Sequence, residues 1–430
     1  MAEAFRMGGV AQSLDELAVA SALDRIAEDV RGGGAKSVLL IPPDITRLDS
    51  MAGELAAGLY ERLVRSGVRV RLMPALGTHR PMTADQNRRM FGEAVLSEHI
   101  LAHRWRDDLV ELGELDAAWV DELSGGRLSA AGVAAPMKVA VNRELIHGGH
   151  DVVISLGQVV PHEVVGLANY SKNILIGVGG PGTIHLSHFL GAVCGMESIM
   201  GRLDTPVRRA LDTGFERFVT PRVDVRFVFT AIESLVSGLK LRGLFYGKER
   251  RTFEEAAELS QRVNLTRLGR PVDRCVVYLE PEEFASTWLG NKAVYRTRLA
   301  MADGGTLIVL APGIETFGED EAIDGLIRRF GYRGTPATLK AVKDHQALRD
   351  NLSAAAHLIH GSSEGRFRIV YATGPGVTKA QVESVGYEHA DLETVRSELG
   401  LEDLTPGWRT LADGGEAYVI DKPALGLWSV

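Results

Sequence analysis

Short apolar runs alternate with amphipathic segments along most of the chain. Continuous apolar runs, which are typical of buried strands, occupy residues 37–41, 68–74 and 151–160. Residues 53–67 repeat apolar positions at helical spacing and end at a glycine, as many helices do. Each apolar run leads into a polar loop before the next helical segment. This order predicts an α/β domain.

A second pattern of the same kind begins near residue 272. It predicts strands at residues 275–280, 306–312 and 366–373, and helices at residues 291–303, 319–331 and 345–360. We place the boundary in the stretch 265–273, which gives expected domains of residues 1–270 and 271–430, with a return of the last residues to the first domain left open. The predicted fold is two α/β domains with the active site in the crevice between them.

Composition narrows the classes of protein. At 430 residues the chain is too long for one ordinary core. A formal net charge of −8 without a long basic run argues against nucleic acid and anionic membranes as partners. Two cysteines are too few for a disulfide scaffold or a thiolate metal cluster. No apolar run approaches the roughly 20 residues that span a bilayer, and the first residues lack the apolar core of a secretory signal, so we expect a cytoplasmic protein.

Polar side chains collect in the loops that follow the first three apolar runs. Asp44 and Arg47 follow the first run, and His79 follows the second. His162 and Lys172 follow the third. Because ligands in open α/β sheets bind outside the carboxyl ends of the strands, these loops predict a site. Simpler interpretations stay open, with Asp44 and Arg47 as a loop ion pair or helix cap and His79 as a turn residue.

Two further segments have ambiguous chemistry. Residues 177–182, GVGGPG, match the G-x-G-x-x-G pattern, but Pro181 interrupts the turn and no acidic residue follows at the distance expected for a nicotinamide site. A glycine-rich phosphate-binding turn remains an alternative. His185 and His188 are three residues apart at the start of a predicted helix, where they either chelate a metal or serve as a cap and a packing residue.

In the second domain, one predicted helix carries a basic face made of Lys292, Tyr295, Arg296 and Arg298. Such a face is usually solvated, and here it is also a candidate for ligand binding.

Together these motifs resemble the nickel-dependent lactate racemases. The resemblance rests on D-x-T-R after a strand, then GTHRPMT, then VVPH followed ten residues later by a lysine and sixteen further by a histidine. It covers the first domain by motif and the whole chain by its two-domain plan. Longer stretches, namely WLGNKAVYRTR, APGIETFGED, AAAHLIHGSSEGRF and PALGLW, resemble a branch that acts on sugar acids, the D-mannonate or D-gluconate 2-epimerases.

The resemblance implies a cofactor and a role for each matching residue. The cofactor is a nickel-pincer nucleotide, pyridinium-3-thioamide-5-thiocarboxylic acid mononucleotide nickel, which some members hold covalently at the lysine matched by Lys172. His188 matches the protein ligand of nickel, and imidazole is a suitable nickel donor. His79 and His162 match the two general bases. The other implied residues are Asp44, Thr46, Arg47, Gly179, Gly180 and Tyr295 for the cofactor, and Arg47, Tyr295, Arg296 and Arg298 for the substrate.

The implied reaction inverts C2 of a small-molecule 2-hydroxy acid. Taking the C2 hydrogen as a hydride avoids a carbanion, and a cofactor must accept it because no side chain can. The two epimers place the hydroxyl on opposite sides, so each needs its own base. The alternatives are a racemase of a smaller acid such as lactate or malate, an NAD-dependent dehydrogenase that uses the turn 177–182, a zinc hydrolase that uses His185 and His188, and a non-catalytic binding protein.

Three departures from the family pattern bear on cofactor and substrate. The glycine pair before the lysine is replaced by residues 168–171, AlaAsnTyrSer, so covalent attachment at Lys172 is an open question. Leu299 stands where many lactate racemases have a lysine, and Leu352 stands in place of an aromatic residue. These changes favour a larger, more polar substrate than lactate.

Overall fold

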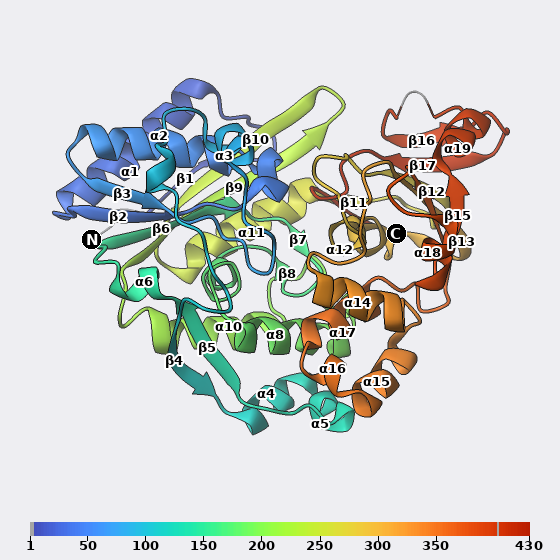
Figure 1. Cartoon of the computed structure of the whole chain (residues 1–430). Helices are drawn as coiled ribbons and strands as arrows, with labels where there is room; N and C mark the ends of the chain where they lie inside the picture. The colour runs from blue at the N-terminus through green and yellow to red at the C-terminus, as the bar shows by residue number, and fades with distance from the viewer. Residues whose placement is uncertain (1–3, 402–403) are drawn as a thin grey trace. The chain divides into compact units, whose positions relative to one another are not determined.

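The computed structural model describes residues 4–401 and 404–430, which form two compact units (Figure 1). Within the described residues, unit 1 comprises Met1–Gly126, Ala134–Ser187 and Ile199–Asn264. Unit 2 comprises Arg127–Val133, His188–Ser198 and Leu265–Val430. The chain therefore leaves unit 1 twice for short segments before it enters the long C-terminal part of unit 2.

Unit 1 is built on a six-stranded sheet in the order β1-β10-β9-β6-β2-β3. The four strands β9, β6, β2 and β3 are parallel, and β10 and β1 continue the sheet antiparallel. The strands predicted at residues 37–41, 68–74 and 151–160 are confirmed. The bounds of the six strands are Phe5–Gly8 (β1), Ser37–Ile41 (β2), Arg69–Leu72 (β3), Val152–Gln158 (β6), Val225–Leu235 (β9) and Gly238–Gly247 (β10).

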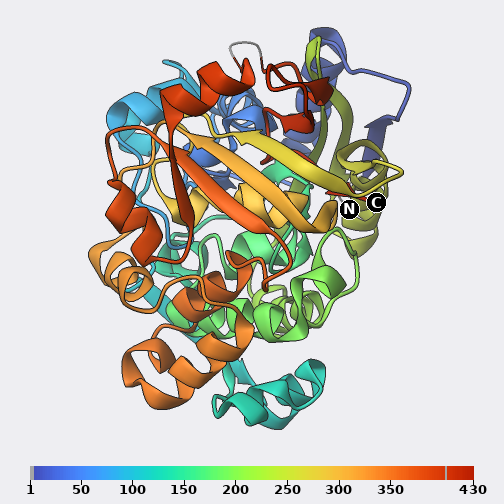
Figure 2. The same ribbon diagram turned by 90° about the vertical axis from the view of Figure 1, so that its right-hand side faces the viewer.

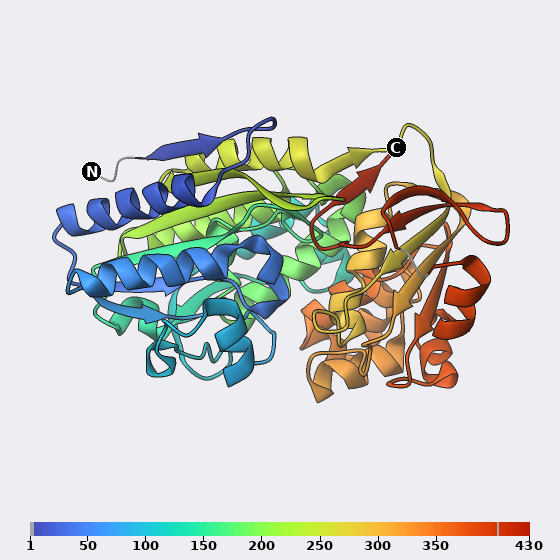
Figure 3. The same ribbon diagram turned by 90° about the horizontal axis from the view of Figure 1, so that it is seen from above.

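Helices cover both faces of this sheet. On one face α1 (Glu16–Gly32) and α2 (Ala52–Arg65) lie side by side (Figure 3), with α2 against β6 and α1 against β10. Their apolar residues share one core with Ile154 and Leu156 of β6. The opposite face of β9 packs against α11 (Arg250–Asn264). Because helices cover both faces of the sheet, both faces of the central strands are buried, and these strands are therefore apolar throughout.

Shorter elements of unit 1 surround the sheet. Strands β4 and β5 form an antiparallel pair, and β7 and β8 form a second small antiparallel pair. The bounds are Leu109–Leu115 (β4), Met137–Asn142 (β5), Pro161–His162 (β7), Gly166–Leu167 (β8), Ile45–Ser50 (η1), Ala84–Phe91 (α3), Ser97–His99 (η2), Ala117–Ser124 (α4), Arg143–His147 (α6), Ser171–Leu175 (α7), Pro206–Gly214 (α10) and Phe215–Val219 (η3). Helix α8 (Pro181–Cys194) begins in unit 1 and continues into unit 2, followed by α9 (Met196–Ile199).

Unit 2 also contains a six-stranded sheet, in the order β15-β14-β13-β12-β17-β16 (Figure 2). All neighbouring strands are parallel except β16 and β17. A separate parallel pair joins β11 to β18 near the end of the chain. The strands are Leu265–Arg267 (β11), Val272–Tyr278 (β12), Met301–Ala311 (β13), Arg368–Thr373 (β14), Glu388–Asp391 (β15), Gly407–Thr410 (β16), Glu416–Ile420 (β17) and Leu427–Ser429 (β18).

The helices of unit 2 agree with the predictions in part. The helix expected over 319–331 is α14 (Glu321–Phe330), whereas the one expected over 345–360 is interrupted where Asn351 caps a second helix. The helix expected over 291–303 is too long, because β13 already begins at Met301, which pairs with Val272. The helices are Arg127–Ala131 (α5), Thr287–Gly290 (α12), Lys292–Thr297 (α13), Thr335–Asp344 (α15), Gln346–Arg349 (α16), Leu352–His360 (α17), Lys379–Ser384 (α18) and Leu392–Leu399 (α19).

Within the part of the chain that the structure describes, no helix is both long and apolar enough to cross a membrane.

Candidate functional site

The loops that carry the predicted residues of unit 1 leave the same edge of its sheet. Ile41 of β2 lies opposite Ser155 of β6, and both strands run in the same direction. The loop after β3 is joined to the loop after α7 by a hydrogen bond from the Gly77 N–H to the Gly177 carbonyl oxygen, at 2.8 Å. The carboxyl ends of β2, β3 and β6 therefore present their polar side chains together, as open α/β sheets do at ligand sites.

Asp44 is the buried centre of this edge. Its Oδ1 accepts hydrogen bonds from the Thr46 backbone N–H at 3.1 Å and from the Thr46 hydroxyl at 2.6 Å, so Asp44 caps η1. Its Oδ2 lies 2.6 Å from Nδ1 of His79. Burial alone would raise the pKa of Asp44, but the charge and hydrogen bond of His79 outweigh it and lower the pKa to about 2. Asp44 is therefore ionised at neutral pH and holds the proton of His79 on Nδ1.

Arg47 follows Asp44 in η1 and interrupts its helical backbone, with φ −126° and ψ 31°. Its Nη1 is buried and has no hydrogen-bond partner among the described residues. A buried guanidinium nitrogen without a partner is unusual in native proteins, and a bound anion would supply one. Arg47 is therefore fitted to receive a carboxylate or a phosphate.

His162 is held differently from His79. The backbone N–H of Val164 donates to its Nδ1 at 3.1 Å, so neutral His162 carries its proton on Nε2. The carboxylate of Glu163 lies 3.8 Å from the same Nδ1. In their neutral forms the two histidines therefore differ at Nε2. This nitrogen has a lone pair in His79 and carries a hydrogen in His162.

Lys172 lies in α7, directly before Asn173, whose side-chain amide donates to the Ser155 hydroxyl at 2.8 Å. Burial first, and the charge of Arg47 second, lower the pKa of Lys172 to about 8, against the opposing effect of Glu163. The amine is therefore closer to its neutral, nucleophilic form at physiological pH than an ordinary lysine is.

The turn before Lys172 has the backbone that glycine normally adopts. Asn169 has φ 75° and Tyr170 has φ 58°. Each such residue costs about 1–3 kcal/mol unless its surroundings hold it in place. The stretch directly before Lys172 therefore contains two residues that adopt positive-φ backbone without being glycine.

The glycine-rich stretch 177–182 is a packing element. It follows helix α7, whereas a dinucleotide fingerprint follows a strand, so this turn lacks the structural context of a standard NAD fingerprint. A Cβ at Gly179 would lie 1.8 Å from the Leu175 carbonyl oxygen, and the Gly180 N–H donates to the Ala140 carbonyl oxygen at 3.1 Å. Close backbone approach explains these glycines, and their contact with a cofactor stays a prediction.

Sequence reasoning missed His103, which contacts this turn at Gly179. The Asn142 side-chain amide donates to its Nδ1 at 3.2 Å, which leaves Nε2–H to donate to the Gly179 carbonyl oxygen at 3.0 Å. Burial lowers the pKa of His103 to about 4, so the ring is neutral. No motif marks this histidine in the sequence.

Gln158 was also missed, although a polar residue at the end of an apolar run is a signal. It is the last residue of β6, lies opposite Thr230 of β9, and is only 5% exposed. Both its side-chain oxygen and its side-chain nitrogen are buried without a hydrogen-bond partner among the described residues. Burying an amide without hydrogen-bond partners lowers the stability of the fold unless a ligand or a water molecule supplies those hydrogen bonds.

The two histidines of α8 fall in different units, with His185 in unit 1 and His188 in unit 2. His185 packs edge-on against Trp105, with ring centroids 6.0 Å apart, and burial lowers its pKa to about 4. No three histidine, cysteine, aspartate or glutamate side chains gather as a metal site in the described ranges. The alternative of a zinc site made by this pair therefore lacks a ligand set, and a metal at His188 needs donors from a bound group.

The predicted basic face of α13 is buried rather than solvated. Arg296 is 0% exposed and Tyr295 only 3%. The Tyr295 hydroxyl lies 2.7 Å from Nδ1 of His357, whose Nε2 lies 2.9 Å from the Tyr332 hydroxyl. A neutral imidazole has one donor and one acceptor nitrogen, so one tyrosine donates to His357 and the other accepts from it. Contacts of Tyr295 and Arg296 with cofactor or substrate stay predictions.

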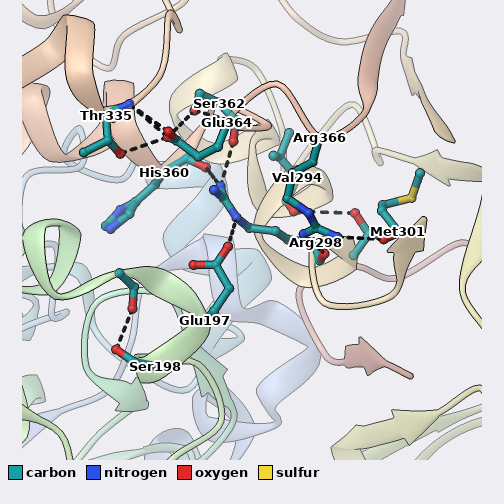
Figure 4. A network of polar contacts seen from close by, with 12 residues as sticks. Glu197, Ser198, Val294, Arg298, Met301, Thr335, His360, Ser362, Glu364 and Arg366 are labelled. Carbon is teal, nitrogen blue, oxygen red and sulfur yellow. Dashed lines mark hydrogen bonds and ion pairs between the residues drawn. The ribbon is translucent and has the colours of Figure 1, made fainter. Parts of the chain in front are cut away.

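Arg298 has a structural task within unit 2 (Figure 4). Its Nε donates to Glu197 at 2.5 Å, and its Nη1 donates to the Ser362 carbonyl oxygen at 2.7 Å. These bonds tie α13 to the segment that follows α8 and to the end of α17. They give Arg298 a reason to be buried without a ligand, and its role in substrate binding stays a prediction.

Comparisons with known proteins agree on the fold. Residues 8–120 match the family model of the lactate racemase N-terminal domain. A solved structure of a protein from Thermotoga maritima is similar with a TM-score of 0.80 and 24% identity, covering 91% of this chain and 95% of that one. The lactate racemase apoprotein from Thermoanaerobacterium thermosaccharolyticum is similar with a TM-score of 0.68 and 17% identity, covering 96% of this chain and 93% of that one. No curated protein matches the chain. The chain has the two-domain α/β fold of the lactate racemase apoprotein.

Proposed function

We propose that this chain is a racemase or epimerase of the lactate racemase family that inverts C2 of a 2-hydroxy acid. The observation that carries the proposal is the 2.6 Å contact between His79 Nδ1 and the buried Asp44 carboxylate. This pair leaves Nε2 of His79 as a base at the sheet edge where Lys172 and Arg47 also lie. The N-terminal family match and the shared fold support the same assignment.

The residues fit the nickel-pincer nucleotide that the family implies. Lys172 offers an amine with a pKa of about 8, suited to attachment, and Arg47 offers a buried nitrogen without a partner, suited to an anionic group. His188 would supply imidazole to nickel, whose remaining donors belong to the nucleotide. When bound, the nucleotide supplies the acceptor for the C2 hydride.

His79 acts on the substrate hydroxyl. Its Nε2 takes the hydroxyl proton of one epimer while the C2–H bond breaks, and Asp44 stabilises the imidazolium that forms. Asp44 stays ionised throughout because its pKa is about 2. Arg47 holds the substrate carboxylate or an acidic group of the nucleotide.

His162 acts on the hydroxyl group of the other epimer. Nδ1 of His162 can carry a proton only when the Val164 N–H no longer donates to it. The carboxylate of Glu163, 3.8 Å from this nitrogen, then balances the positive charge of the ring. His162 in this form returns a proton from Nε2 to the oxygen at C2. Inversion through a 2-keto acid requires one histidine to accept a proton while the other, protonated on both ring nitrogens, returns one.

The substrate that we propose is a sugar acid, D-gluconate or D-mannonate. Leu299 and Leu352 replace a charged and an aromatic residue of the lactate enzymes, which favours a longer molecule. The amide of Gln158 has one group that donates and one that accepts, as recognition of a substrate hydroxyl requires. Lactate or malate is the alternative within the same reaction class.

The test uses gluconate deuterated at C2, in ordinary water, with protein produced alongside the machinery that makes the pincer nucleotide. NMR follows the appearance of mannonate and the position of the label. Mannonate that keeps deuterium at C2 supports return of the same hydride. Mannonate that has lost the label indicates proton abstraction and overturns the mechanism. Absence of mannonate from protein that contains nickel and nucleotide, with turnover of lactate or malate, overturns the sugar acid as substrate.

A further inference from the structure

The turn before Lys172 must be held by its neighbours. Tyr170 combines φ 58° with ψ −135°, which lies close to a region that glycine almost alone occupies, and Asn169 before it has φ 75°. Two such residues in succession relax to ordinary backbone unless contacts oppose the change. Any relaxation would alter the direction in which the next residues, Ser171 and Lys172, leave the turn.

Arg208 of α10 holds this turn with three hydrogen bonds. Its Nη2 donates to the Leu167 carbonyl oxygen at 2.6 Å. Its Nη1 donates to the Asn169 carbonyl oxygen at 3.1 Å and to the Ser171 hydroxyl at 3.0 Å. Arg208 is 0% exposed, so these bonds are made without competition from water. The planar guanidinium reaches both sides of the turn at once, which the single ammonium of a lysine cannot do.

Asp212 completes the arrangement one helical turn later. Its Oδ1 accepts a hydrogen bond from the Ser171 hydroxyl at 2.5 Å and lies 3.5 Å from Nη1 of Arg208. Arg250 also pairs with Asp212. The carboxylate therefore balances the buried charge of Arg208 and fixes the hydroxyl that Arg208 also contacts. We refer to Arg208 and Asp212 together as the turn clamp.

The ring of Tyr170 is fixed by aromatic neighbours. It stacks on Phe253 with ring centroids 5.3 Å apart and planes at 15°, and Phe227 and Phe215 lie 4.9 Å and 5.6 Å from it. The Tyr170 side chain is thus locked on one side of the turn while the turn clamp holds the carbonyl oxygens.

Lys172 lies between two anchored residues. The turn clamp binds Ser171, and the side-chain amide of Asn173 donates to the Ser155 hydroxyl at 2.8 Å and to the Ile41 carbonyl oxygen at 3.3 Å. We propose that Arg208 and Asp212 are positioning residues for Lys172, which hold the strained turn so that the amine points into the site. This inference rests on the proposed function, in which Lys172 carries the cofactor.

The pKa of Lys172 depends on where its amine lies. Burial and the charges of Arg47 and Arg208 lower the pKa of Lys172 to about 8, while Glu163 and Asp44 act in the opposite direction. If the turn relaxes, the amine leaves this environment and its pKa moves back toward the ordinary value of 10.5.

The experiment measures Lys172 in the full-length protein without cofactor or substrate. Competitive acetylation with acetic anhydride is followed by peptide mass spectrometry from about pH 6 to about pH 11, with the exposed Lys240 as internal standard. In the parent protein, Lys172 acetylation should reach half its maximum near pH 8. In Arg208→Lys the midpoint should rise by about one unit or more, which at pH 8 lowers the neutral fraction of the amine by about fivefold or more.

Asn169→Gly distinguishes positioning from general stability. Glycine adopts positive φ without strain, so this change should leave the midpoint unaltered in the parent protein and lower it again in the Arg208→Lys background. An unaltered midpoint in Arg208→Lys, or the same effect of Asn169→Gly in both backgrounds, overturns the inference. If Arg208→Lys does not fold, Ser171→Ala, which deletes one hydroxyl of the arrangement, takes its place with the same expected direction. No turnover is measured, so failure here and failure of the proposed function are separate results.

Discussion

His79 Nδ1 lies 2.6 Å from Oδ2 of Asp44, and the same carboxylate caps η1 through Thr46. Asp44 is 3% exposed, so its charge is compensated by His79 and the cap rather than by water. This contact fixes which nitrogen of His79 is free to accept a proton. Asp44, which begins η1, therefore also sets the tautomer of His79 in the loop after β3.

Asp44→Asn should lower the rate of the proposed inversion at C2 by about a hundredfold or more, with a much smaller change in KM. An amide favours the wrong tautomer of His79 and cannot stabilise the imidazolium. Thr46→Val, which removes one donor but keeps the carboxylate, is the control and should cost far less. Steady-state kinetics of both variants check this, and equal losses in the two would contradict it.

The Asp44 carboxylate should also contribute to stability in a defined pH range. Its pKa is lowered from 3.8 to about 2 in the folded state, so the folded protein holds fewer protons and is stabilised above pH 3.8. The contribution, about 2 kcal/mol, is lost as the pH falls toward 2. Asp44→Asn should therefore unfold more easily at neutral pH, and the difference should shrink below about pH 4 in denaturant titrations.

Gln158→Leu should separate stability from activity. Removing an amide that is buried without partners should raise the free energy of unfolding by about 1 kcal/mol, while kcat/KM for a sugar acid falls by about tenfold or more. Asn173→Leu is the matched control, because the Asn173 amide is satisfied by Ser155 and Ile41 and its removal should destabilise the protein. Urea unfolding and kinetics of both variants decide the matter, and destabilisation by Gln158→Leu would contradict it.

Acidification should loosen the glycine turn through His103. Burial lowers its pKa from 6.5 to about 4, so the unfolded chain binds the proton more readily and stability is lost as the pH falls from 6.5 toward 4. The loss is up to about 3 kcal/mol. Hydrogen exchange in residues 176–180 should speed up over this range, and His103→Gln should flatten the dependence. An equal dependence in the variant would show that another group is responsible.

Lys172→Met should stabilise the protein without cofactor. The Lys172 pKa is lowered from 10.5 to about 8, so the folded state disfavours the charged amine, and at pH 7 the full penalty of up to about 3 kcal/mol is present. The gain from methionine should shrink as the pH rises through 8 toward 10.5. Thermal unfolding at neutral and alkaline pH tests this, and a gain that does not change with pH would contradict it.

Sequence patterns predict the part of this structure that depends on local burial. Strands buried on both faces give apolar runs, so β2, β3 and β6 can be found from the sequence, and the rule that ligands bind at strand ends leads to Asp44, His79 and Lys172. The end of α13 could not be found in this way, because the apolar residues near 299–302 suit a helix as well as a strand. Pairing of Met301 with Val272 decides between them.

The partners of the predicted residues depend on contacts between distant segments. Asp44 and His79 are 35 residues apart, and Ser171 and Arg208 are 37 residues apart. No periodicity in the sequence marks such a pair. The same holds for Gln158, whose polar character is visible in the sequence but whose lack of a partner is a property of the folded chain.

The division of the chain into units has a consequence for its synthesis. Unit 2 takes in Arg127–Val133 and His188–Ser198, yet most of it begins at Leu265. A ribosome therefore releases these two segments long before the rest of their unit exists, and the remaining strands of unit 1 are synthesised in between. A chain cut near residue 264 would leave both segments, including the proposed nickel ligand His188, without the unit to which they belong. These two segments should therefore bind chaperones most strongly during synthesis before residues 265–430 have been added.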